Sequence, residues 1–132
     1  MATQARNTSQ FAGDYLVLPV LASTKIYAGT LVAVDDTGHA IPGAKAADLL
    51  AAGRAEETVD NTDGADGDIT IRVARGVFKW DNSAENPVET AGVLKPCYMA
   101  GDGTVTAEAT GSSAAGKVLG IDTDGGVIVE TR

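Results

Sequence analysis

The sequence contains few of the residue types on which reactive sites depend. It has one cysteine, Cys97, and one histidine, His39, in 132 residues. A single cysteine excludes an internal disulfide framework, and the two residues lack the spacing of a zinc site. The G-x-S-x-G motif and the phosphate-binding glycine patterns are also absent. A Cys97–His39 nucleophile pair could form only if the fold brought the two residues together, because no sequence motif supports it. We therefore expect a structural or interaction protein rather than an enzyme, with no catalytic residue and no cofactor.

Basic residues and long apolar runs are also scarce. Ten lysines and arginines face 18 aspartates and glutamates, which gives a net charge of −8. Such a chain repels phosphate backbones, so we expect no nucleic-acid partner. The apolar run YLVLPVLA, residues 15–22, is too short to span a membrane. It follows Asp14, contains Pro19 and has only Arg6 before it as a positive charge, unlike a signal peptide. We expect a protein that is made and used without crossing or entering a membrane.

Aromatic residues make up only 5% of the chain, whereas glycines number 16. This composition favours short strands and tight turns over packed helices. Residues 53–80 give the most coherent pattern, with two extended segments around an acidic, glycine-rich loop. Three residues of one parity predict a half-buried strand before Gly76: Ile69, Ile71 and Val73. After Gly76 the bulky residues are Phe78 and Trp80, which indicates a bulge or bend and two aromatic anchors in an aliphatic core.

Turn signals divide the rest of the chain. Hairpins are predicted around three glycine-containing turns, at residues 35–38, 101–103 and 122–126. Pro19 predicts an edge strand or an irregular extended run. Residues 42–52 contain good helix formers and predict either a short helix or an irregular connector, and residues 89–95 predict one helical turn before Pro96. Residues 108–116 are predicted to form a flexible loop of small residues. With roughly eight short strands, the chain is predicted to be mainly β, a small sandwich or partly closed barrel with short helical turns.

Two acidic loops and the N-terminal segment each leave two interpretations. Aspartates cluster in the loops at residues 60–68 and 122–124, but neither loop matches the EF-hand pattern, and aspartate and glycine are ordinary turn residues. We predict no metal site there. Residues 1–14 are treated as an N-terminal arm and residues 15–132 as a single β-rich domain. The small, polar segment at residues 1–12 is either a frayed tail or an arm that orders along a partner subunit, where Phe11 would pack.

Several segments together resemble the capsid cement, or head decoration, proteins of tailed bacteriophages and prophages. They are YAGTLVAVDDTGHAIPGA (residues 27–44), GRAEETVDNTDGADGD (53–68), RVARGVFKWDNS (72–83), KPCYMAGDGTVT (95–106) and GKVLGIDTDGGVIVET (116–131). These motifs are strands and turns, and their order and spacing carry the resemblance from about residue 25 onward.

The resemblance implies a protein that binds the outside of the expanded icosahedral head and stabilises it against the pressure of packaged DNA. It further implies a homotrimer that contacts the major capsid protein, present in the host cytoplasm during assembly and then on the virion's outer surface. We expect contacts with the capsid or a neighbouring copy from Arg6, Gln10, Phe11 and Tyr15. The alternative is a small ligand- or carbohydrate-binding β module of a virion or cell surface, for which the aromatic residues are few.

Overall fold

The computed structural model describes residues 3–6 and 14–132. Within these residues it contains twelve strands and one 3₁₀ turn. In chain order they are β1 (Tyr15–Pro19), β2 (Thr24–Ile26), β3 (Leu31–Val34), β4 (Ala40–Pro42), β5 (Leu50–Ala55), β6 (Val59–Asn61), β7 (Thr70–Ala74), β8 (Gly76–Asn82), η1 (Thr90–Gly92), β9 (Pro96–Met99), β10 (Thr104–Thr106), β11 (Ala114–Ile121) and β12 (Val127–Thr131). The prediction of a mainly β protein, either a small sandwich or a partly closed barrel, is confirmed in class, although the strands number twelve rather than roughly eight and the barrel is closed.

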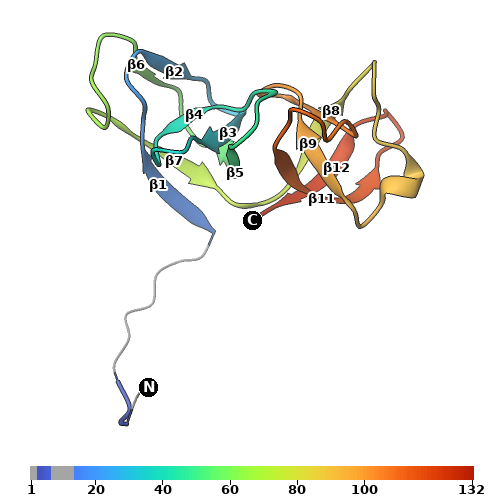
Figure 1. Ribbon diagram of the computed structural model, residues 1–132, viewed down its shortest axis with the longest axis horizontal. Helices are drawn as coiled ribbons and strands as arrows, with labels where there is room; N and C mark the ends of the chain where they lie inside the picture. Colours follow the sequence, from blue (N-terminus) through green and yellow to red (C-terminus); the bar gives the residue numbers. More distant parts are fainter. Residues whose placement is uncertain (1–2, 7–13) are drawn as a thin grey trace.

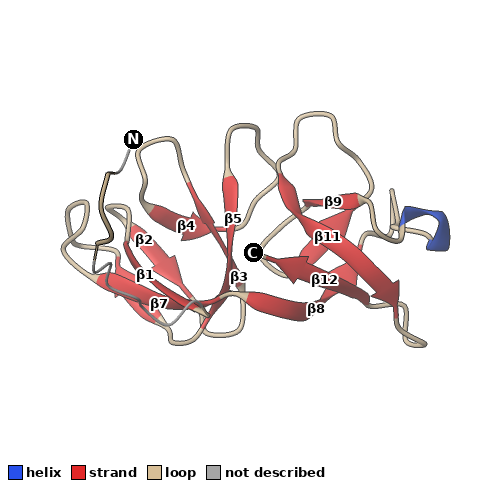
Figure 2. Ribbon diagram, turned by 90° about the horizontal axis from the view of Figure 1, so that it is seen from below, coloured by secondary structure: helices blue, strands red, loops and turns tan. Residues whose placement is uncertain are grey.

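The strands form a sheet at one end of the molecule and a closed barrel at the other (Figure 1). The sheet has the order β1-β7-β5-β3-β4, and the two-stranded ribbon β2-β6 lies beside it. The barrel consists of β10-β8-β12-β11-β9 and closes where β9 pairs with β10. The chain passes from sheet to barrel at Arg75, between β7 and β8 (Figure 2). The bulge or bend predicted at Gly76 is therefore a break between two strands.

Two clusters of buried side chains fill these two parts. The sheet core consists of Val20, Ile26, Val32, Ala40, Ala52, Ala55, Ile71 and Val73. The barrel core consists of Leu31, Ala33, Trp80, Val88, Cys97, Met99, Val105, Ala115, Val118, Val127 and Val129. Strand β3 connects them, because side chains alternate along a strand and Val32 faces the sheet core while its two neighbours face the barrel core. Burying both faces of β3 joins the two parts.

The central pattern at residues 53–80 is confirmed in its packing but not in its number of strands. Ile71 and Val73 are fully buried, Trp80 lies in the barrel core, and Phe78 packs against it with the two ring centroids 5.8 Å apart. The two predicted extended segments are in fact four strands. Strand β6 leaves the main sheet to pair with β2, whereas β5 pairs with β7.

Two further expectations need correction. The short helix considered for residues 42–52 is wrong. The alternative of an irregular connector holds for residues 43–49, since Pro42 belongs to β4 and β5 begins at Leu50. Asp48 has a positive φ of 63°, which interrupts a right-handed helix. Ser113 holds the connector in place, since its hydroxyl donates to the Ala46 carbonyl and accepts from the Leu49 N–H. The predicted loop at residues 108–116 is shorter than expected, because β11 already begins at Ala114.

The remaining turn predictions are confirmed. Hairpins join β3 to β4, β9 to β10 and β11 to β12, and η1 lies in the predicted helical turn. Pro19 ends β1, which lies at the edge of the sheet as predicted. Most of the expected arm, including Gln10 and Phe11, falls outside the described residues.

Candidate interaction surface

Strand β1 has an open edge. In the antiparallel pairing with β7, the Arg75 N–H donates to the Asp14 carbonyl at 2.8 Å, and the Val20 N–H donates to the Ile69 carbonyl at 3.0 Å. Hydrogen-bonded pairs alternate along such a ladder. The backbone groups of Tyr15 and Val17 therefore point away from β7, toward the side where no strand pairs with residues 15–18 in the described chain. Pro19 has no N–H and limits how far another strand could extend.

The side chains on the outer face of β1 are apolar and exposed. Tyr15 is 44% and Val17 67% exposed, whereas Leu16 and Leu18 pack against the sheet core. The Arg72 guanidinium of β7 lies 4.1 Å from the centre of the Tyr15 ring. We call Tyr15, Val17 and Arg72 the β1 face. It combines the aromatic and arginine side chains that are enriched at protein interfaces with an unpaired strand edge.

Of the four residues expected to contact a partner, the structure places Tyr15 on the β1 face. Arg6 is exposed and lies outside any strand, and Gln10 and Phe11 lie outside the described residues. Sequence reasoning missed Val17 and Arg72. Alternation could have found them, because Val17 has the parity of Tyr15, and Arg72 lies between the buried Ile71 and Val73.

The Cys97–His39 pair considered from the sequence does not form. Cys97 is fully buried in the barrel core, and this burial raises the pKa of its thiol to about 11. His39 lies beside the β3–β4 turn, half-buried, and its Nδ1 is 2.8 Å from the Thr37 hydroxyl. No hydrogen bond joins His39 to Cys97 in the part of the chain that the structure covers. The buried thiol has little thiolate with which to act as a nucleophile.

The acidic loops use their carboxylates to hold turns. Asp60 accepts hydrogen bonds from the N–H and hydroxyl of Thr62, and Asp66 accepts one from the Ala22 N–H. At the β11–β12 turn, Lys79 bridges Asp122 at 3.3 Å and Asp124 at 2.7 Å. No three potential metal ligands group together within residues 3–6 and 14–132.

These contacts shift several pKa values. Hydrogen bonds from Thr62 lower the pKa of Asp60. The hydrogen bonds that Lys79 donates to Asp124 and Asp122 raise the pKa of Lys79. The hydrogen bond from Lys79 is the largest cause of the lowered Asp124 pKa. The hydrogen bond from the Thr123 N–H is the largest cause of the lowered Asp122 pKa. All of these groups are exposed, so the shifts describe turn geometry and point to no catalytic acid or base.

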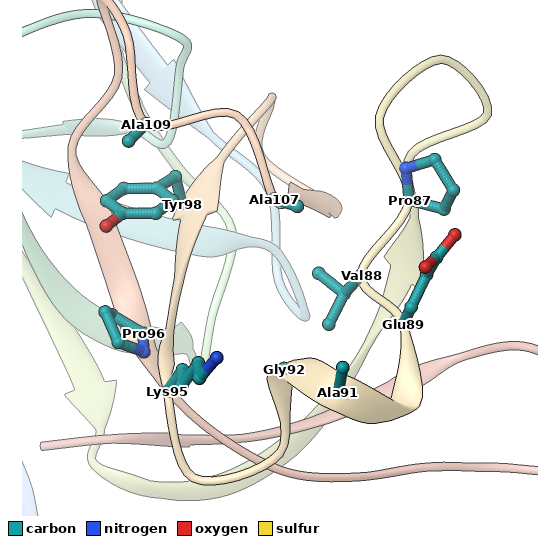
Figure 3. Close-up of a pocket in the computed structure, with 10 residues that line it drawn as sticks. All are labelled: Pro87, Val88, Glu89, Ala91, Gly92, Lys95, Pro96, Tyr98, Ala107 and Ala109. Carbon is teal, nitrogen blue, oxygen red and sulfur yellow. The ribbon is translucent and has the colours of Figure 1, made fainter.

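A shallow pocket of about 400 Å³ opens on the outside of the barrel beside η1 (Figure 3). Figure 3 shows the Tyr98 ring on one side and Val88 and Pro87 on the other, with Glu89 and Lys95 as its only charged residues. The pocket's chemistry fits binding of a small apolar or sugar-like group against one aromatic ring.

Among the described residues, no helix is both long and apolar enough to cross a membrane. No family model matches the chain, and no curated protein or solved structure matches it.

Proposed function

We propose that this protein is a bacteriophage capsid decoration, or cement, protein that binds the outer surface of the expanded head. The observation that carries the proposal is the ordered set of strand and turn motifs between residues 27 and 131, which resembles that family. The mainly β fold is compatible with it. The strands that bear these motifs hold the sheet and the barrel together through β3, which suits a rigid brace.

The β1 face is the proposed contact with the major capsid protein or with a neighbouring copy. Its strand edge offers backbone donors and acceptors at Tyr15 and Val17, and its side chains offer apolar area and a cation. A strand from another subunit that pairs there gains backbone hydrogen bonds, and the alternate side chains supply specificity. Residues 1–14, with Arg6, Gln10 and Phe11, precede this edge directly and are proposed to extend the same contact.

The mechanism needs no bond-making. A protein that binds the expanded lattice better than the unexpanded one stabilises the expanded state by mass action. A homotrimer would present three β1 faces at once, so weak contacts would combine through multivalency. An acidic protein also avoids competing with the capsid for the genome.

Co-sedimentation with purified empty shells, in expanded and unexpanded forms, tests the proposal. The chain should sediment with expanded shells and remain in solution with unexpanded ones. Val17→Lys places a charge on the β1 face and should weaken binding about tenfold or more, since interface centres tolerate buried charge poorly. Val77→Lys is the matched control, because Val77 is an exposed valine on barrel strand β8. Equal binding to both shell forms, or no binding to either, would contradict the proposal.

The second candidate is a small carbohydrate-binding module, and the Tyr98 pocket is the observation in its favour. Size-exclusion chromatography with mass measurement separates the two candidates. A trimer that sediments with shells supports the cement protein. A monomer that retains a small sugar and loses it after Tyr98→Ala supports the module.

A further inference from the structure

A second pocket, of about 340 Å³, lies where the sheet meets the barrel. One wall is formed by residues 49–51 at the start of β5, and another by residues 114–116 of β11. Arg75, which links β7 to β8, and Arg132 at the end of the chain complete it. Figures 1 and 2 both show the end of the chain between the sheet and the barrel.

The charge in this pocket is opposite to that of the protein as a whole. The chain carries a net charge of −8, yet the charged residues that line the pocket are two arginines and no aspartate or glutamate. Arg132 has one distant acidic neighbour, with 3.8 Å between its Nε and the Glu130 Oε2, and its side chain is 56% exposed. The Arg132 guanidinium is therefore accessible to an incoming anion.

Arg75 shows that an acceptor is missing. Its Nε is buried and has no hydrogen-bond partner, and its side chain forms no ion pair, within residues 3–6 and 14–132. The arginines of strands β5 and β7, by contrast, have partners. Arg54 of β5 pairs with Glu56 at 2.9 Å, and Arg72 of β7 stacks on Tyr15. A buried donor without an acceptor is costly, and native proteins rarely leave one. The Nε itself is closed to solvent, so a ligand in the pocket would pair with Arg75 through its other guanidinium nitrogens.

The pocket walls narrow the chemical class of that ligand. A guanidinium group matches a carboxylate or a phosphate through two parallel hydrogen bonds. The Thr131 hydroxyl already donates to the Ala115 carbonyl at 3.0 Å, so the side-chain donors left in the pocket are those of the two arginines. The walls are otherwise leucine and alanine, and Leu50 is 72% exposed beside the arginines. These surroundings fit a carboxylate attached to an aliphatic group.

We propose that the Arg75–Arg132 pocket binds an aliphatic carboxylate. This chemistry has two possible sources, a free small carboxylic acid or an aspartate or glutamate beside an aliphatic residue on a second copy of this chain. The proposal does not depend on the protein being a cement protein.

Titration with 4-methylpentanoate, followed by NMR or calorimetry, tests the site directly, and the neutral 4-methylpentanamide is the matched control ligand. The acid should bind, and Arg75→Gln should weaken it by about tenfold or more, as expected for a charge-assisted hydrogen bond. Arg54→Gln, outside the pocket, should leave it unchanged. If Arg75→Gln does not fold, Arg132→Gln serves instead, because its exposed side chain carries little of the fold.

Sedimentation velocity separates the two sources. Self-association that disappears in Arg75→Gln, and that 4-methylpentanoate competes away, indicates a carboxylate of a second copy. Binding of the acid without any change in self-association indicates a free acid. The proposal is overturned if the amide binds as tightly as the acid. It is also overturned if neither acid binding nor self-association responds to Arg75→Gln, or if Arg54→Gln has the same effect.

Discussion

The guanidinium group of Arg72 lies 4.1 Å from the centre of the Tyr15 ring, and this contact ties the edge strand β1 to its neighbour β7. An exposed cation–π pair contributes about 0.5–1 kcal/mol. A double-mutant cycle with Tyr15→Ala and Arg72→Gln, measured by urea unfolding, should give a coupling energy of that size. Tyr15→Ala alone should leave the fold intact while it weakens binding to expanded shells. A coupling energy near zero would remove this contact from the description of the β1 face.

Gly53 should be intolerant of substitution. It has a φ of +150°, and a Cβ atom there would lie 1.9 Å from the Ala74 carbonyl oxygen of the neighbouring strand. Because backbone on both strands would have to move, Gly53→Ala should lower the free energy of unfolding by about 2–4 kcal/mol. Gly103→Ala is the control, since no atom lies within 4 Å of its Cβ position. Equal midpoints of chemical denaturation for the two variants would be inconsistent with the β5–β7 packing.

Cys97 should not react with alkylating reagents in the native protein. Its side chain is fully buried in the barrel core, and its pKa is raised to about 11. At pH 8 we expect iodoacetamide to leave it unmodified until denaturant opens the barrel, because the thiolate is the reactive species. Mass spectrometry of samples labelled across a urea series checks this. Complete labelling of the native protein within minutes would mean that the barrel is open.

The Lys79 bridge to Asp122 and Asp124 should make stability depend on pH in the acid range. The folded pKa values of both carboxyl groups are lowered from the ordinary 3.8, so the bridge stabilises the fold above that value and is lost as the pH falls through the folded pKa. The raised pKa of Lys79 has the matching sign: its contribution is present below 10.5 and is lost at higher pH.

Melting temperatures of Asp124→Asn between pH 2 and 7 measure this effect. The variant should be less stable than the wild type at pH 7, and the difference should shrink toward pH 2. The effect should be small, because all three groups are exposed. Asp36→Asn, in the exposed β3–β4 turn, should follow the wild type. A difference that is constant from pH 2 to 7 would exclude the bridge as its cause.

The sequence pattern predicted most strands and turns, because strand alternation and turn residues depend on near neighbours in the chain. Alternation around Ile71 and the turn at residues 101–103 each act over a few residues, and both were predicted correctly. The pairing of β2 with β6 was not predictable, since three-residue strands carry almost no pattern and their partner is set by tertiary packing. The connector at residues 42–52 was ambiguous for the same reason. Its course depends on Ser113, more than 60 residues away in the sequence.

The candidate site was predicted only in part. Tyr15 was expected from its aromatic character, but the open edge of β1 becomes visible only when the strand order is known. The unpartnered Nε of Arg75 has no sequence signal, because it results from the meeting of sheet and barrel.

A density map of phage particles purified from cells that produce this chain tests the central claim, the proposed capsid role, most directly. The account predicts that the chain lies on the outer surface of the expanded head, with its β1 face against the capsid protein or a neighbouring copy. Its absence from purified particles, or a position inside the shell, would contradict the account.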